Sequence, residues 1–206
     1  MVRAVAGASP VDHPNMTDIK QFVFSWVKES PENAEQINSG FYCETSDVFQ
    51  ARLNKMREFL LQKKIISEDS VYLIAAMVGE IGNNSFDHNI GSWPDVPGIF
   101  FAYDFSDAKN IIILADRGRG ILTTLKKVKP ELINDTQALE TAFLEKISGR
   151  APENRGNGLK FVKQNIKQLK MHLSFISGNA QAELNEKMEI KEIPEKINGC
   201  LAILEF

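Results

Sequence analysis

The chain has 206 residues, of which 43% are hydrophobic and 25% charged, as is typical of a globular protein. A net charge of −3 and a pI near 5.7 leave no basic excess for phosphates, which argues against nucleic acid as the main partner. Two cysteines, Cys43 and Cys200, are too few for a disulfide framework, so we expect free thiols. No apolar run is long enough to span a membrane and no signal peptide is evident, so we expect a cytoplasmic protein.

The first third of the chain is expected to be an extension of the main domain. Residues 1–16 are rich in Ala, Gly, Pro and polar residues and predict a loose tail. From Thr17 an aromatic-rich segment predicts a short helix or an irregular cover. Residues 45–62 predict an amphipathic helix, whose basic residues form a solvated face or, alternatively, dock a partner. We therefore expect a tail and helical extension over 1–66 and the main domain over 67–206.

Residues 71–89 predict a helix that changes character along its length. Its first half is apolar on nearly every side. Its second half is polar, and Glu80, Asn84 and His88 form one stripe because residues four apart lie about 40° apart around a helix. Alone, this stripe fits a functional wall or a helix end emerging into solvent equally well.

The remainder of the chain predicts strands and further helices. Residues 98–106 and 110–118 predict two strands joined by a short polar turn, as in an antiparallel hairpin. The later expected elements are helices over 122–132, 135–148 and 159–170, strands over 172–177 and 199–206, and between these strands a polar connection with a short strand over 182–193. This order indicates an α+β fold, an α/β sandwich with helices packed on one face of a mixed, largely antiparallel sheet.

A first glycine motif, Asp116-x-Gly118-x-Gly120, ends the apolar strand. A carboxylate at a strand end accepts a donor, and glycines let a ligand come close to the backbone. Ordinary turn chemistry also explains so short a motif.

A second glycine motif, Gly156-Asn-Gly158-Leu159, opens a helix. The unpaired N–H groups and the positive dipole end of a helix start suit a phosphate group. A plain glycine-containing helix start is the alternative. No Walker-type phosphate loop occurs in the sequence.

The order and spacing of the polar stripe and the two glycine motifs resemble one superfamily of ATPases. They are similar to the gyrase, chaperone, histidine-kinase and MutL (GHKL) ATPases, whose nucleotide site is the Bergerat fold. The resemblance covers roughly residues 69–206. It implies a histidine-kinase-like ATP-binding domain over 67–206, with a lid over 121–155.

The resemblance also implies a role for each matching residue. Glu80 would be the general base that orients the attacking water or hydroxyl opposite the γ-phosphate. Asn84 would bind Mg²⁺, which bridges the phosphates. Asp116 would accept the exocyclic amine of adenine, and Gly118 and Gly120 would allow the base to approach.

The second glycine motif would complete the phosphate end of this site. Gly156 and Gly158 would close over the phosphates, with the helix that begins at Leu159 aimed at them. His88 would be structural or act through its neighbours. Where the superfamily often has Thr after the glycine of its last strand, this chain has Cys200, and a thiol is a much poorer hydrogen-bonding group.

The function implied is that of a Mg²⁺-dependent ATP-binding protein that hydrolyses ATP slowly. The alternative is a regulatory protein of the anti-sigma-factor type, which binds a protein partner and acts as a serine kinase. A nucleotide-sensing scaffold is a third reading, and a homodimer remains open.

Overall fold

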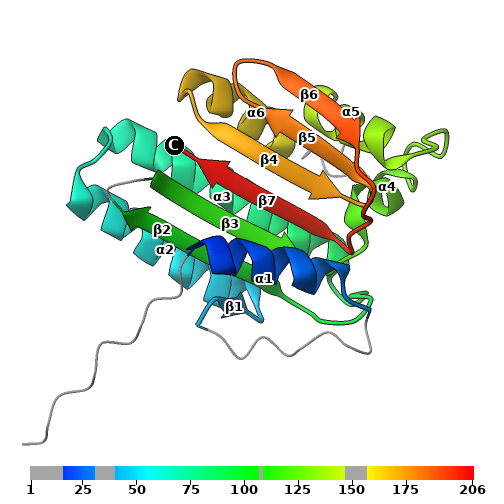
Figure 1. Cartoon of the computed structure of the whole chain (residues 1–206), viewed down its shortest axis with the longest axis horizontal. Coiled ribbons are helices and arrows are strands. Elements are labelled where there is room, and N and C mark those ends of the chain that lie inside the picture. Colours follow the sequence, from blue (N-terminus) through cyan, green and yellow to red (C-terminus); the bar gives the residue numbers. More distant parts are fainter. Residues whose placement is uncertain (1–15, 31–39, 107–108, 147–156) are drawn as a thin grey trace, which may run out of the picture.

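The computed structural model of this protein describes residues 16–30, 40–106, 109–146 and 157–206. These residues form helices and one seven-stranded sheet (Figure 1). The helices are α1 (Met16–Lys28), α2 (Ser46–Lys63), α3 (Glu68–Asn89), α4 (Gly120–Leu125), α5 (Asp135–Leu144) and α6 (Gly158–Gln168). The strands are β1 (Tyr42–Cys43), β2 (Ile99–Ser106), β3 (Lys109–Asp116), β4 (His172–Ser177), β5 (Ala180–Leu184), β6 (Met188–Glu192) and β7 (Cys200–Glu205).

The sheet has the strand order β1-β2-β3-β7-β4-β5-β6, and every neighbouring pair is antiparallel. The predicted hairpin of β2 and β3 is confirmed, with Ile99 opposite Asp116. The C-terminal strand β7 lies between β3 and β4, so that Cys200 pairs with both Asp116 and Ser177. The α+β class and the largely antiparallel pairing are therefore confirmed, whereas the parallel pairs that a mixed sheet requires do not occur among the described strands.

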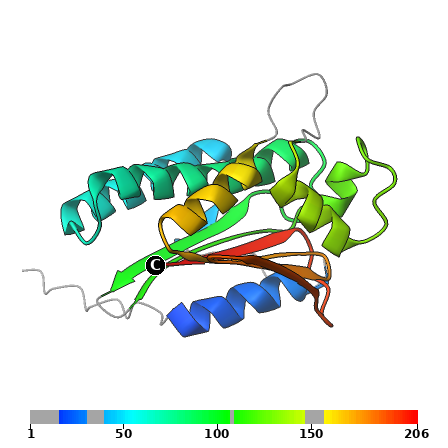
Figure 2. The same cartoon turned by 90° about the horizontal axis from the view of Figure 1, so that it is seen from above.

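Helices cover both faces of the sheet, which corrects the expectation that they lie on one face. Figure 2 shows α1 (blue) on one side of the sheet and α2, α3 and α6 on the opposite side. The reason lies in β3: Ile112 and Leu114 belong to the core under α2, α3 and α6, whereas Ile111 and Ile113 pack with α1. A strand that is apolar on both faces needs a cover on each.

The described part of the N-terminal third packs on the same sheet as the later elements. The aromatic-rich segment forms α1, which buries Val23, Trp26 and Val27 against the sheet. On the other face, α2 buries Phe49 and Met56 in the main core.

Two further elements differ from the sequence-based expectation. The single strand expected over 182–193 is a hairpin of β5 and β6, because Asn185 closes a tight turn by accepting the N–H of Lys187 at 3.0 Å. The helix expected over 122–132 ends at Leu125, because the chain turns back and packs Leu132 against it.

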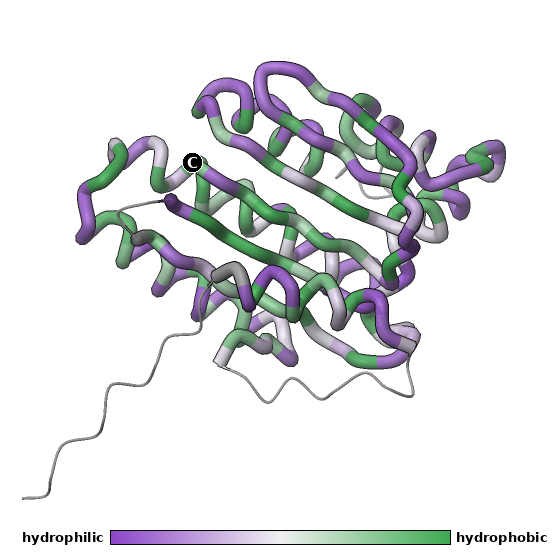
Figure 3. The backbone as a smooth tube through the Cα atoms, viewed as in Figure 1, coloured by the Kyte–Doolittle hydropathy of each residue, from purple (hydrophilic) through white to green (hydrophobic). Residues whose placement is uncertain are grey.

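The longest helix, α3, places the polar stripe within the fold. Ser67 caps it, and its hydroxyl oxygen accepts the N–H of Ser70 at 3.3 Å. The helix remains packed on one side to its end, where Phe86 is 6% and Asn89 is 4% exposed, while Glu80 of the polar stripe is exposed. Figure 3 shows the hydrophobic central strands beside it and the hydrophilic β5–β6 edge. None of the described helices is long and apolar enough to cross a membrane.

Candidate functional site

The polar half of α3 contacts the two glycine motifs on different parts of the fold. Glu80 and Asn84 lie at the start of α6. The next residue, Ser85, contacts Asp116 at the end of β3. The structure thus brings most of the predicted site residues together along one helix.

At the first end of this site, Glu80 and Asn84 lie against the first turn of α6. A Cβ atom at Gly158 would lie 2.5 Å from Oε2 of Glu80 and 3.3 Å from Nδ2 of Asn84, so glycine is the residue that leaves room for both side chains. Asn157, the residue before α6, makes no capping hydrogen bond with its side chain. The Asn157 side chain therefore leaves the first N–H groups of α6 available to an anion.

At the second end, the Asp116 carboxylate is 2% exposed. The hydroxyl of Ser85 donates to its Oδ2 at 2.7 Å, and the N–H of Gly118 donates to its Oδ1 at 2.8 Å. Burial nevertheless raises the pKa of Asp116 from 3.8 to about 6. This carboxylate is an acceptor whose charge is only partly compensated, as a site for a donor group of a ligand would require.

Gly118 packs against the end of α3. A Cβ atom there would lie 2.2 Å from Nδ2 of Asn89, so a side chain has no room. The Asn89 side chain accepts the N–H of Arg119 at 2.9 Å and donates to the carbonyl of Ser85 at 2.8 Å. Gly118 therefore lies directly against α3, and the approach of a base to this glycine stays a prediction.

Gly199 and Gly120 complete the backbone around Asp116. Gly199 has φ +69°, and a Cβ atom there would lie 2.4 Å from Oδ1 of Asp116. Gly120 has φ +73°, and the residue after it donates its N–H to Ser177 Oγ at 2.9 Å. Both backbones adopt the left-handed conformation that glycine tolerates without strain.

Cys200 lies beside the same carboxylate. Its thiol is 3.6 Å from the Ser177 hydroxyl. Burial and the negative charge of Asp116 raise the pKa of this thiol well above its ordinary value. The thiol is therefore protonated at neutral pH and acts as a weak hydrogen-bond donor.

The remaining predictions have different outcomes. Gly156 lies outside the described residues, as does the part of the predicted lid after residue 146. Leu159 is buried in the main core, where it anchors α6. The described part of the lid forms α4 and α5, and Phe143 of α5 packs edge-on against Phe175 of β4 at 5.5 Å.

The sequence-based reasoning missed four residues that shape the site: Ser85, Asn89, Arg117 and Asn198. Ser85 and Asn89 are four residues apart and therefore lie on the same side of the helix, toward the end of β3. This second polar stripe in the sequence could have identified them as site residues. Arg117 is fully buried, and nothing in its sequence context distinguishes it from a surface arginine.

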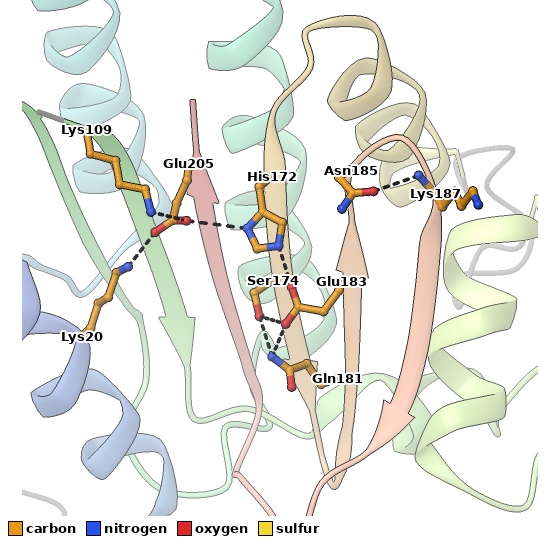
Figure 4. Close-up of polar contacts among 9 residues, drawn as sticks. All are labelled: Lys20, Lys109, His172, Ser174, Gln181, Glu183, Asn185, Lys187 and Glu205. Carbon is orange, nitrogen blue, oxygen red and sulfur yellow. Dashed lines mark hydrogen bonds and ion pairs between the residues drawn. The ribbon is translucent and has the colours of Figure 1, made fainter.

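A second polar cluster lies at the opposite end of the strands (Figure 4). Nε2 of His172 is 2.7 Å from Oε2 of Glu183, and its Nδ1 is 3.7 Å from Oε2 of Glu205. Glu205 also pairs with Lys20 of α1 and Lys109 of β3. Since β7 places its first residue beside Asp116 and its last beside His172, this cluster is separate from the candidate site.

A groove between α2 and α3 adjoins Glu80 on its other side. Its lining combines polar and aromatic side chains, among them Arg57, Tyr72, Asn83 and Glu80, with the apolar Leu53, Ala75 and Ala76. The guanidinium of Arg57 lies 5.9 Å from the centre of the Tyr72 ring. Glu80 is thus accessible from the groove as well as from the start of α6.

Among the described residues, no group of three or more His, Cys, Asp or Glu side chains could hold a metal ion. No protein-family model matches the sequence, and no curated protein shows significant similarity to it.

Proposed function

We propose that this protein binds Mg²⁺–ATP in the manner of the GHKL ATPases and hydrolyses it slowly. One observation carries the proposal. The helix α3 places the exposed carboxylate of Glu80 at the start of α6 and the hydroxyl of Ser85 against the buried carboxylate of Asp116. Each of these pairs is explicable alone, and their occurrence along one helix, in the order of the motifs, supports a site that binds the two ends of a nucleotide.

At the phosphate end, the N–H groups at the start of α6 would bind the phosphates, and Glu80 would orient the attacking water. Positioning and charge stabilisation are most of what phosphoryl transfer requires of a protein. Glu80 is exposed, as a base that must meet a water molecule has to be. The proton that leaves this water would pass to its carboxylate.

At the adenine end, Asp116 would accept the exocyclic amine of the base. An amine donor would compensate the buried negative charge of this carboxylate, which receives only hydrogen bonds from Ser85 and from backbone N–H groups. Gly120 and Gly199 leave no side chain between this acceptor and a base.

Asn84 fits the role of a magnesium ligand because its half-buried amide lies beside Glu80 at the start of α6. An amide oxygen is a hard ligand, and Mg²⁺ commonly takes one or two protein ligands with phosphates and water supplying the rest. When bound, the ion would neutralise charge that develops on the phosphates.

Thermal unfolding with and without Mg²⁺–ATP tests the binding. At a nucleotide concentration of about 100 Kd, binding stabilises the folded state by about 2.7 kcal/mol, or about 5–10 °C in Tm for a domain of this size. Unchanged Tm at millimolar Mg²⁺–ATP would refute the proposal.

Turnover tests the role of Glu80. The Glu80→Ala variant should keep the thermal shift and lose hydrolysis, measured as released phosphate. Asn83→Ala is the matched control, because Asn83 lies on the same helix and contacts Gln50 of α2 at 2.8 Å. If the Glu80 variant hydrolyses ATP as fast as the control, the base is another group.

The groove beside Glu80 favours a second candidate function, phosphoryl transfer to a protein partner. A serine hydroxyl presented from this groove would reach the same carboxylate that otherwise orients water. Incubation with γ-labelled ATP and a cell lysate distinguishes the two: label on one protein supports a kinase, and free phosphate alone supports an ATPase. Arg57→Glu should then reduce labelling without changing ATP binding.

A further inference from the structure

We propose that Arg117 is a positioning residue through which α1 holds the adenine end of the site in its binding geometry. The inference rests on the proposed function and extends it. It gives α1, which lies outside residues 67–206, a role in the geometry of the nucleotide site. It rests on two anchors that connect the end of α1 to the loops beside Asp116.

The first anchor is Arg117, the residue that follows Asp116. Its guanidinium is fully buried and ion-pairs with Oδ2 of Asp95, at 2.9 Å from Nε and 2.6 Å from Nη2. The same guanidinium donates to the carbonyl of Glu29 at 2.8 Å and to the carbonyl of Trp26. Its Cζ also lies 5.6 Å from the centre of the Trp26 ring.

The second anchor is Asn198, the residue that precedes Gly199. Its backbone N–H donates to the carbonyl of Val27 at 2.7 Å, and its side chain donates to the carbonyl of Glu29 at 3.0 Å. The last carbonyls of a helix have no partner within the helix, and a cation is favoured there. Arg117 and Asn198 therefore cap α1 from two different loops.

These anchors flank the backbone that encloses the acceptor. Arg117 lies between Asp116 and Gly118, whose N–H donates to that carboxylate, and Asn198 precedes Gly199, whose backbone touches it. Removing the acceptors of a buried guanidinium costs a large amount of free energy. If α1 leaves the sheet, Arg117 has to move, and the loop from Asp116 to Gly120 has to move with it.

The arrangement gives α1 an effect on one end of the site only. Glu80 and Gly158, at the phosphate end, make none of these contacts. Loss of the Arg117 or Asn198 contacts should therefore weaken the binding of adenine and leave the rate of the chemical step unchanged. A merely structural arginine would instead lower stability and active fraction without this selective effect.

The test compares three variants of the full chain with the wild type. Arg117→Lys keeps the charge but cannot span the same acceptors, because an ammonium lacks the planar fork of a guanidinium. Asn198→Ala is milder and removes one side-chain hydrogen bond at an exposed position. Lys20→Met is the matched control, since it removes the ion pair with Glu205 at the other end of α1.

Hydrogen exchange over residues 117–120 and the kinetics of ATP hydrolysis are measured for each. We expect faster exchange in both anchor variants, a rise of about tenfold in KM for Arg117→Lys and a smaller rise for Asn198→Ala, within the range of measured couplings between sites. The value of kcat should not change, and Lys20→Met should match the wild type in every measurement.

Three results would overturn the inference: unchanged exchange in Arg117→Lys, faster exchange with unchanged KM, or equal effects in Lys20→Met. A fall in kcat at unchanged KM would assign Arg117 a structural role and overturn it too. If the wild type binds no ATP, the proposed function and this role in it both fail. Exchange would then still decide whether α1 fixes the loop.

Discussion

The buried carboxylate of Asp116 makes a prediction about stability that needs no nucleotide. Its pKa rises from 3.8 to about 6 on folding, and each pKa unit corresponds to about 1.4 kcal/mol. A carboxyl whose pKa is raised in the folded state contributes stability below the unfolded pKa, and this contribution is lost as the pH rises through the folded pKa. Between about pH 4 and pH 7, ionisation of Asp116 should therefore cost the unliganded protein about 3 kcal/mol.

The Asp116→Asn variant removes this ionisation while keeping the shape of the side chain. The substituted amide can accept the N–H of Gly118 with its oxygen and donate to the Ser85 hydroxyl, which can rotate to accept. The free energy of unfolding of the variant, relative to the wild type, should therefore rise by about 3 kcal/mol between pH 4 and pH 7.

Urea denaturation of both proteins at a series of pH values measures this difference. Subtracting the wild-type curve cancels the other titrating groups, since they are common to both chains. A difference that does not depend on pH would refute the argument, because it would mean that Asp116 titrates alike in the folded and unfolded states. The same variant should lose most of the thermal shift caused by ATP.

Three further predictions concern the liganded protein. The affinity for ATP should fall as the pH drops below 6, since a protonated Asp116 is a weaker acceptor for the adenine amine than the carboxylate; isothermal titration calorimetry that finds no such fall contradicts the assignment. Gly158→Ala should slow hydrolysis without lowering Tm, because its Cβ atom displaces the flexible end of Glu80, and phosphate release at the wild-type rate would contradict this. Cys200→Thr should lower Kd for ATP about fivefold, since a hydroxyl bonds better than a thiol by about 1 kcal/mol, and Cys200→Val is the isosteric control that should not.

Local sequence patterns predicted the elements whose signals are local. The apolar run of β3 and its polar turn were enough to predict the hairpin with β2. The strand at 172–177 has the predicted bounds for the same reason. Of the candidate site, the stripe and the first glycine motif were identified because their residues are close in sequence.

Contacts distant in sequence could not be predicted in this way. The aromatic-rich segment read equally well as a helix or an irregular cover, because what makes it α1 is the second apolar face of β3. Arg117 bonds residues 88 and 91 positions earlier in the chain, and no short motif encodes such a pair. The buried state of an arginine depends on partners that only the folded chain brings to it.

The change of character within α3 follows from its two sets of neighbours. Its first half contributes Val71, Ile74, Met77 and Val78 to the main core shared with α2 and the sheet, and is apolar for this reason. From Glu80 to Asn89 the helix advances about 14 Å, passing first the start of α6 and then the loop that follows β3. The helix α3 thus sets the spacing between the exposed carboxylate of Glu80 and the buried carboxylate of Asp116. The side chains at a solvated helix end would point into water. Here the Ser85 hydroxyl donates to Asp116, and the Asn89 side chain donates to the carbonyl of Ser85 and accepts the N–H of Arg119.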